Sequence, residues 1–313
     1  MLISVILVSF NTAEMTVKAL DNLFASECEL NMEVFVVDNA SKDSSVAYIK
    51  RFYPNITLIE NTKNVGFGRA NNQVLNLIRG DYVLLLNTDA FVGKDTLDKT
   101  SQYMQANPDC GVLGVKLLGS KGELQPSCRY FPTPFNLLAN REGLHRFFPN
   151  IKLIDDIDWN SDITQGCDWV PGCYYLIKKE VIDQVGLFDP AYFLYYEEVD
   201  HCYAVKKAGW KVIYFSETSV LHIGGESAKL VGKVTSSGRQ LNKLLVESEL
   251  IYFRKNHGAF TCLLQIVLIL FSDIIHTFKN FFKLRMSNLF TFSDTKLYVV
   301  TAWNTRLGLV PTK

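Results

Sequence analysis

The first 90 residues alternate short, almost wholly apolar runs with longer stretches whose apolar residues recur at helical spacing. The apolar runs span 3–9, 33–38, 57–60 and 81–86. Continuous aliphatic and β-branched runs of this length are typical of strands buried on both faces. The intervening stretches predict helices over about 12–26, 43–53 and 66–78. Strands alternating with helices predict right-handed βαβ units, and so an α/β fold with a mostly parallel central sheet flanked by helices.

The pattern is less regular after residue 120. Residues 125–162 hold four of the nine prolines and predict a long excursion over one face. Order returns with an expected strand at 169–177, a helix at 178–185 that Gly186 ends, a helix at 195–208 that Gly209 ends, and a strand at 211–215. We therefore expect a catalytic domain over 1–228, with a nucleotide-binding half at about 1–120 and an acceptor half at 121–228.

Residues 229–313 are expected to form a helical, basic extension. Residues 258–271 are apolar over about 14 positions, which is short of the roughly 20 needed to span a bilayer. Apolar residues continue to Phe282 at helical spacing, with Lys279, Lys283 and Arg285 among them. This favours a helix over 259–285 lying on an anionic membrane surface, and the alternative is a helix packed on the catalytic domain or in a dimer contact.

Composition narrows the class of protein further. The formal net charge of the 313 residues is zero, so no nucleic-acid partner is expected, yet from Ile251 onward eight Lys or Arg face two Asp. Seven cysteines without a Cys-x-x-Cys pair indicate a reduced, cytoplasmic chain without structural zinc. The opening MLISVILVSFN has no basic leader or cleavage site, and we interpret it as a strand.

Polar residues follow each predicted strand of the first half. Asn11, Asp38, Asn64 and Asp89 all lie just beyond a strand end. In parallel sheets ligands bind beyond the carboxyl ends of the strands, so we expect these side chains along one functional rim.

The stretch LLLNTDA, residues 84–90, predicts a metal ligand at that rim. Asn87 and Asp89 present two oxygens across a threonine, and such oxygens suit Mg²⁺ or Mn²⁺ holding a diphosphate. His222, which precedes two glycines, is the candidate for a further ligand. Each residue alone has a simpler interpretation, because a single Asp after a strand is often a helix cap and a single His is usually structural.

The stretch YYEEVDHC crowds three carboxylates, Glu197, Glu198 and Asp200, into four residues. On a helix Glu197 and Asp200 share a face, and Glu198 points elsewhere. A solvated acidic face is the simple interpretation. The aromatic and apolar flanks favour partial burial instead, which raises carboxylate pKa values as a general base requires.

Several enzyme classes are disfavoured by missing motifs. The first strand is followed by SFNTAE, with no glycine-rich phosphate loop, which argues against Rossmann dehydrogenases, P-loop enzymes and nucleotidyltransferases. Gly-x-Ser-x-Gly and His-Glu-x-x-His are also absent from the sequence, which disfavours serine hydrolases and zincins.

Taken in order, the motifs resemble family-two inverting glycosyltransferases of the GT-A fold, and most closely the rhamnosyltransferase group among them. The stretches that carry the resemblance are SVILVSFN (4–11), VVDNASKDSS (36–45), NVGFGRANN (64–72), LLLNTDA (84–90), GLFDPAYFLYYEEVDHCYAVKKAGWKV (186–212), HIGGES (222–227) and YFRKNHG (252–258).

The resemblance implies metal-dependent inverting transfer of a sugar, rhamnose among the candidates, from a dTDP- or UDP-linked nucleotide diphosphosugar to a hydroxyl. The acceptor would be a glycan, either lipid-linked or part of a surface polysaccharide, at the cytoplasmic face of the cell membrane. Asp89 and His222 match the metal ligands, and Glu198 matches the catalytic base. The residues expected around the nucleotide sugar are Val8, Phe10, Asp38, Asn64, Gly66, Arg69 and Asn87.

Two departures from the family pattern keep alternatives open. Asn87 replaces the first acid of Asp-x-Asp, which makes the site less negative, and Glu198 replaces the usual Asp base. Glu197 or Asp200 could therefore be the working base. We also expect the aromatic segment 159–175, with Val170, Pro171 and Gly172, to line the sugar and acceptor side. A catalytically inactive sugar-nucleotide-binding scaffold is the rival interpretation, and a homo-oligomer is compatible with the sequence.

Overall fold

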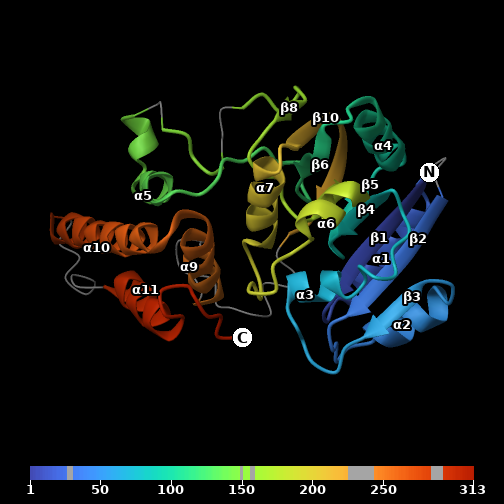
Figure 1. The fold of residues 1–313 in the computed structure, drawn as a ribbon, viewed down its shortest axis with the longest axis horizontal. Helices are drawn as coiled ribbons and strands as arrows, with labels where there is room; N and C mark the ends of the chain where they lie inside the picture. The colour runs from blue at the N-terminus through green and yellow to red at the C-terminus, as the bar shows by residue number, and fades with distance from the viewer. Residues whose placement is uncertain (27–30, 149–150, 156–158, 225–242, 283–291) are drawn as a thin grey trace. The chain divides into compact units, whose positions relative to one another are not determined.

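The structure is a computed structural model that describes residues 1–313 apart from 27–30, 149–150, 156–158, 225–242 and 283–291 (Figure 1). The chain divides into two compact units. Unit 1 comprises 1–129, 157–190 and 197–233, and unit 2 comprises 130–156, 191–196 and 234–313. The units are interleaved in sequence, and the expected domain boundary at 228/229 lies outside the described residues.

Unit 1 is built on a sheet whose first half has the predicted βαβ pattern. The strands are β1 (Leu2–Ser9), β2 (Asn31–Asp38), β3 (Thr57–Glu60) and β4 (Tyr82–Leu86), in the parallel order β3-β2-β1-β4. The helices between them are α1 (Ala13–Phe24), α2 (Ser45–Phe52) and α3 (Phe67–Asn72). Helix α3 ends six residues earlier than the expected 78, and turns continue the chain to Leu77.

Burial on both faces explains the unbroken apolar runs. Ile3, Val5 and Leu7 of β1 share one buried cluster with Leu20 and Leu23 of α1. Alternate residues of a strand point to opposite faces, yet Ile6 between them is also only 1% exposed. A run without polar positions is therefore what this central strand requires.

The second half of the sheet is mixed. Its strands are β5 (Ala90–Val92), β6 (Cys110–Leu118), β7 (Leu124–Gln125), β8 (Gln165–Gly166), β9 (Tyr174–Lys178) and β10 (Lys211–His222). Strand β9 runs antiparallel to both β4 and β6, whereas β10 is parallel to β6 and antiparallel to β5. The expected mostly parallel pairing therefore holds for β1 to β4, and the whole sheet is a mixed α/β sheet with flanking helices.

Helices α4 (Thr96–Ala106), α6 (Lys179–Val185) and α7 (Glu197–Lys207) complete unit 1. Gly186 and Gly209 follow α6 and α7 with φ of 79° and 95°, a conformation that favours glycine. The two helix ends were thus predicted correctly. Strand β10 is longer than the predicted 211–215, because it continues past an irregularity between Phe215 and Ser219 to His222.

Part of the predicted excursion over 125–162 is helical and belongs to unit 2. Helix α5 (Pro134–Glu142) begins with a capping box in which Thr133 and Asn136 bond each other's backbone. Pro134 lies in its first turn, where a missing N–H costs nothing. One of the prolines that suggested an irregular segment, Pro134, therefore marks a helix start.

The other helices in the described part of unit 2 are α9 (Lys243–His257), α10 (Ala259–Phe282) and α11 (Ser293–Asn304). The unbroken apolar run of about 14 residues is shorter than the helix that contains it. Helix α10 has 24 residues and is long and apolar enough to cross a membrane by length and composition.

Candidate active site at the carboxyl ends of the strands

Asp38 ends β2 and is buried, with 2% of its surface exposed. Its Oδ2 accepts the backbone N–H of Ser41 at 2.9 Å, whereas its buried Oδ1 has no hydrogen-bond partner. A buried acceptor without a donor is costly, and a ligand that offers an N–H there would remove the cost. The geometry therefore suits a donor group such as the N–H of a nucleotide base.

Asn39, the next residue, holds the loop that follows β3. Its Nδ2 donates to Asn64 Oδ1 at 3.0 Å and to the carbonyl of Gly66, and its Oδ1 accepts the N–H of Val65 at 3.0 Å. Gly66 has φ of 93°, which a residue with a side chain would adopt only under strain. Asn64 and Gly66 are thus fixed at the same rim as Asp38, and Asn39 is a positioning residue that the sequence analysis did not single out.

Asp89 and His222 lie side by side, although 132 positions separate them in the sequence. Strand β10 pairs with β5 so that His222 is opposite Ala90. His222 Nε2 is 3.6 Å from Asp89 Oδ1, and both side chains are largely buried. The structure therefore brings together the two predicted metal ligands.

Gln125 fixes the orientation of the imidazole. Its Nε2 donates to the His222 carbonyl at 2.9 Å, and its Oε1 lies 2.8 Å from His222 Nδ1. Because Oε1 can only accept, Nδ1 carries the proton and Nε2 presents a lone pair towards Asp89. Burial lowers the pKa of His222, and the nearby Arg129 lowers it further against the opposing effect of Asp89.

A neutral imidazole facing a carboxylate fits a cation. Two acceptors 3.6 Å apart cannot bond each other, but oxygen and nitrogen ligands about 2.0–2.2 Å from a shared ion lie about 3 Å apart. Within the described ranges no third His, Cys, Asp or Glu joins this pair. The residues fit a divalent ion whose remaining ligands are water and substrate oxygens, as is usual for Mg²⁺.

The three acids at the start of α7 have different environments. Glu197 and Asp200 are buried, at 1% and 4% exposure, whereas Glu198 is half-buried. The Glu197 side chain lies against Gly68, where an added Cβ would be 3.2 Å from Glu197 Cγ. Burial, followed by the charge of Glu198, raises the pKa of Glu197 well above its usual value. Of the three acids, the geometry favours Glu198 as the one a substrate can reach.

Glu198 lies against the Val-Pro-Gly segment. Gly172 lies next to its carboxylate, because an added Cβ on Gly172 would be 3.9 Å from Glu198 Oε1. Burial raises the pKa of Glu198, while its own backbone N–H, Arg129 and Gly172 oppose the rise. A carboxylate with a raised pKa that is still stabilised as an anion has the properties of a general base.

The Gly172–Cys173 step connects the two halves of the site. Gly172 lies next to Glu198, and the carbonyl of Cys173 accepts the N–H of Asn87 at 3.0 Å, two residues before Asp89. Burial raises the pKa of the Cys173 thiol to about 12. The negative charges of both Asp89 and Glu198 add to this rise. Glu198 and Asp89 therefore flank one short segment of backbone.

Arg129 is a site residue that the sequence analysis missed. Its guanidinium stacks on Trp169 with 4.6 Å between its Cζ and the ring centroid, and Nε donates to the Pro126 carbonyl at 3.2 Å. Its charge acts on Glu198, Cys173 and His222. The stretch SCRY contains no motif that distinguishes this arginine from others. Its place at the site becomes evident only from the structure, where an antiparallel β-bridge joins Arg129 to Trp169.

The expected aromatic lining is mostly core. Tyr174 and Tyr175 are buried: Tyr174 hydrogen-bonds Thr100, and the hydroxyl of Tyr175 lies 2.8 Å from Nδ1 of His201. Trp159 packs on Tyr214 in an edge-on contact. The hypothesis that 159–175 stacks on sugars was therefore wrong for both tyrosines, because strand alternation and burial of β9 direct them into the sheet. Gly172 and Trp169 remain at the site through Glu198 and Arg129.

The other predicted nucleotide-binding residues lie along the same rim. Val8 and Phe10 are half-buried at the end of β1, beside Asp38, and Asn87 is half-buried after β4. Arg69 of α3 donates from Nε to the Pro190 carbonyl at 2.8 Å, and Asn72 bonds both backbone groups of Phe188. Helix α3 therefore supports the segment that precedes α7.

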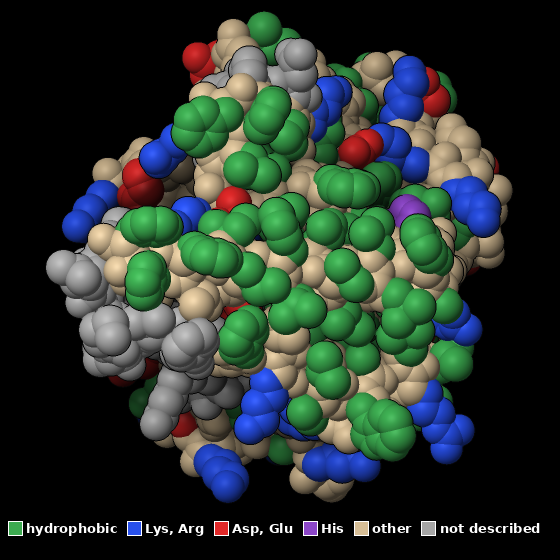
Figure 2. All heavy atoms as spheres, turned by 90° about the vertical axis from the view of Figure 1, so that its left-hand side faces the viewer, with side chains coloured by type: hydrophobic (Ala, Val, Ile, Leu, Met, Phe, Trp, Pro, Cys, Tyr) green, Lys and Arg blue, Asp and Glu red, His purple; other side chains and the backbone are tan. Residues whose placement is uncertain are grey.

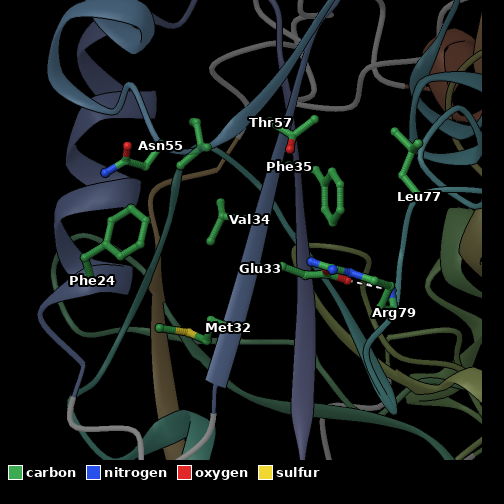
Figure 3. A pocket seen from close by; sticks show the side chains of 10 residues that line it. Phe24, Met32, Glu33, Val34, Phe35, Asn55, Thr57, Leu77 and Arg79 are labelled. Atoms are coloured by element: carbon green, nitrogen blue, oxygen red, sulfur yellow. Dashed lines mark hydrogen bonds and ion pairs between the residues drawn. The ribbon is translucent and has the colours of Figure 1, made fainter.

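A hollow of about 500 Å³ lies elsewhere in unit 1 (Figure 3). Its lining includes Met32, Glu33 and Val34, at the start of β2, and Glu33 is ion-paired with Arg79 at 3.0 Å. Asp38 is at the opposite end of the same strand, about 17 Å away at 3.3 Å per residue. This hollow is therefore separate from the candidate site.

Comparison with known proteins shows which sequences this chain is similar to. The sequence model of glycosyl transferase family 2 matches residues 4–154. An N-acetylglucosaminyl-diphospho-decaprenol L-rhamnosyltransferase of Mycobacterium tuberculosis is 27% identical over 217 residues, covering 62% of this chain and 67% of that protein. The rhamnosyltransferase WbbL of Escherichia coli is 24% identical over 231 residues, covering 71% and 83%.

Solved structures share the fold. A mannosyltransferase from Pyrobaculum calidifontis, in complex with GDP-Man and Mn²⁺, superposes with a TM-score of 0.52 at 17% identity and covers 97% of this chain and 86% of that one. Residues 1–349 of TarS from S. aureus, in complex with UDP-GlcNAc, give 0.52 at 14% identity, covering 98% and 92%. By these sequence matches and the shared fold, the chain is similar to glycosyltransferase family 2 and, within it, to rhamnosyltransferases.

Proposed function

We propose that this glycosyltransferase is an inverting, metal-dependent hexosyltransferase that takes its sugar from a dTDP- or UDP-linked nucleotide diphosphosugar. Rhamnose is the first sugar to test, because two of the relatives are named rhamnosyltransferases. The acceptor is a hydroxyl of a lipid-linked glycan or a surface polysaccharide, in line with the diphospho-decaprenol acceptor in one relative's name.

One observation carries the proposal: the Gly172–Cys173 step lies next to Glu198 on one side and is bonded on the other to Asn87, two residues before Asp89, which pairs with His222. A base and a cation-binding pair that flank one segment can act on opposite sides of a single anomeric carbon. That arrangement is what single-displacement transfer with inversion needs.

In the proposed reaction, Glu198 takes the proton from the acceptor hydroxyl as the oxygen attacks the anomeric carbon. The new bond forms on the face opposite the bond to the diphosphate, which breaks, and the anomeric configuration inverts. Burial raises the pKa of Glu198, and the charge of Arg129 opposes this rise and so favours the ionised form that accepts a proton. Asp38 offers its free Oδ1 to the base of the nucleotide, which fixes the donor at the rim.

Asp89 Oδ1 and His222 Nε2 would hold Mg²⁺ or Mn²⁺, and Gln125 keeps the imidazole in the ligating tautomer. The ion, when bound, supplies positive charge to neutralise the departing diphosphate. Asn87 lies two residues before Asp89 and has an amide where the family pattern has a carboxylate. The site therefore carries less negative charge than one with two acids.

We also propose that the protein works at the cytoplasmic face of the cell membrane as a peripheral protein, since a lipid-linked acceptor is confined there. The proposal is supported by the six described cysteines, none of which forms a disulfide, and by the apolar helix α10.

The test compares Glu198→Gln with Glu197→Gln in a transfer assay with purified protein, Mn²⁺ and dTDP-rhamnose or UDP-sugars. Glu198→Gln should lower kcat by about 10²- to 10⁴-fold, because it removes the general base. Glu197→Gln is the matched control: burial favours the protonated form of Glu197, so an isosteric amide should keep most of the activity. Equal activities of wild type and Glu198→Gln would show that Glu198 is not the base.

An inactive sugar-nucleotide-binding scaffold is the second candidate, and the unusual Asn87 is the observation that favours it. A thermal-shift screen of nucleotide sugars with and without Mn²⁺ separates the two, because a bound ligand raises Tm by mass action. A shift without transfer to any lipid-linked or glycan acceptor would support the scaffold.

A further inference from the structure

Helix α10 of unit 2 presents its large apolar side chains outward. The exposed members recur at helical spacing along its whole length: Phe260, Leu263, Val267, Leu270, Phe271, Ile274, Phe278, Phe281 and Phe282. Phe260 is 76% exposed and Phe282 is 79% exposed. A helix on the surface of a soluble domain normally has the reverse pattern, with its apolar stripe facing the core.

The inner side of α10 is mostly polar, and its polar residues bond to other helices of unit 2. Gln265 donates to Glu249 of α9 at 2.8 Å, and Ser272 donates to Glu142 of α5. Asp273 pairs with Arg141 of α5 at 2.8 Å and accepts the N–H of Thr295 of α11 at 3.0 Å. These bonds fix which side of the helix faces inward, so the outward direction of its apolar side is set by the fold.

Neighbouring elements of unit 2 also carry exposed apolar side chains. Helix α11 exposes Val299, Val300 and Trp303, the last at 85%, and Phe147 and Phe148 follow α5. Figure 2 shows hydrophobic side chains gathered in one broad patch on this side, with Lys and Arg around its edge. We call the exposed apolar residues of α10 and α11 the outer apolar face.

The charges of unit 2 are sorted by sign. Its exposed charged side chains in the described ranges are basic: Arg146, Lys152, Lys243, Lys255, Lys279, Lys296, Arg306 and Lys313. The acids Glu247, Glu249 and Asp273 are buried, and the side chain of Glu142 is 1% exposed. A surface with apolar residues and exposed positive charge complements an anionic lipid surface.

We propose that the outer apolar face docks in the plane of an anionic bilayer, with α10 lying in the interfacial layer instead of crossing it. The inference rests on the membrane association proposed above and specifies the surface and the lipid. A crossing orientation would place the Asp273–Arg141 pair and Lys279 at hydrocarbon depth, where charges are costly. An in-plane orientation leaves these groups bonded on the inner side and buries only the apolar stripe.

The test is co-sedimentation of the full chain with phosphatidylcholine vesicles that contain or lack phosphatidylglycerol. Wild type should bind the anionic vesicles, and raising the salt to 0.5 M should weaken binding, because salt screens the attraction between the basic residues and the anionic lipid. Phe271→Ser/Phe278→Ser and Lys296→Glu/Arg306→Glu should each reduce partitioning at least about tenfold. Phe52→Ser is the matched control, since Phe52 is 52% exposed on α2 of unit 1, and it should bind like wild type.

Trp303 reports docking directly. Its fluorescence should shift to the blue with anionic vesicles and be quenched by lipids brominated near the headgroup, and Trp303→Phe should lose this signal. Quenching that is strongest at the bilayer centre, absence of vesicle binding, or a dimer in solution that Phe271→Ser/Phe278→Ser dissociates would each overturn the proposal. Glu198→Gln should bind vesicles like wild type, so a failure of the catalytic assignment leaves this result distinguishable.

Discussion

Strand β4 and helix α10 are both strongly apolar segments, yet they place polar residues in opposite ways. In β4 every residue is buried, and the polar side chains begin only where the strand ends, at Asn87 and Asp89. In α10 the polar residues Gln265, Ser272 and Asp273 are inside, and the phenylalanines are outside. The comparison teaches that an apolar run alone does not tell which side of an element faces the interior of the protein. The bonding partners of its polar residues do tell this.

The largest expected effect is on the free energy of unfolding, when a polar residue on the inner side of α10 is removed. Asp273→Ala leaves Arg141 with fewer partners in a buried position and should lower the free energy of unfolding by about 3–5 kcal/mol. Asp294→Ala is the matched control, because Asp294 pairs with the same arginine but is 31% exposed, and it should cost about 1 kcal/mol or less. Urea unfolding of both variants measures the difference, and equal costs would mean that burial of the pair is unimportant.

The next effect is the pH dependence of the stability of unit 2. Glu249 is buried against α10, and burial raises its pKa to about 7 despite hydrogen bonds from Tyr298, Tyr196 and Gln265. The folded state therefore holds a proton that the unfolded state loses near pH 4.5, so stability is full below pH 4.5 and falls as the pH rises towards 7. The loss is roughly 2–3 kcal/mol.

Glu249→Gln should flatten this dependence, because the amide does not titrate. Urea unfolding at pH 5 and pH 8 gives the comparison. A wild-type chain whose stability does not fall between these values would show that Glu249 is ionised at low pH in the folded protein.

The smallest effect concerns the rim of unit 1. Gln125→Leu keeps the size of the side chain but removes the acceptor for His222 Nδ1–H, so the imidazole is free to turn or change tautomer. The affinity for Mn²⁺ should fall about 10–100-fold, as measured by calorimetry in the presence of a nucleotide diphosphate. Unchanged affinity would mean that strand β10 alone holds the imidazole.

Much of unit 1 follows from the sequence, because its signals are local. The apolar runs predict β1 to β4, and Gly186 and Gly209 end α6 and α7 where expected. The pairing of Asp89 with His222 was expected because Asp89 follows a buried strand and because the order of the motifs resembles that of a known family. The direction of β9 and the pairing of β5 with β10 are set by contacts between distant residues, which no local pattern reveals.

What the sequence leaves undecided depends on side-chain environment. The sequence does not show which of Glu197, Glu198 and Asp200 a substrate can reach, and only their burial in the structure distinguishes them. Arg129 and Gln125 gain their roles from the partners that the sheet brings to them. The inverted polarity of α10 was likewise hidden, since helical spacing gives the apolar stripe but not the direction in which it points.

The two residues before α7 have a practical consequence for truncation experiments. Tyr195 and Tyr196 have φ of 72° and 69°, a conformation that costs energy in residues with large side chains. Tyr196 bonds Glu249, and the carbonyl of Leu194 accepts from Ser248, so α9 holds this strained turn. Cutting the chain ahead of α9 would release the turn and allow Glu198 to shift, so an inactive truncated protein would say nothing about membranes.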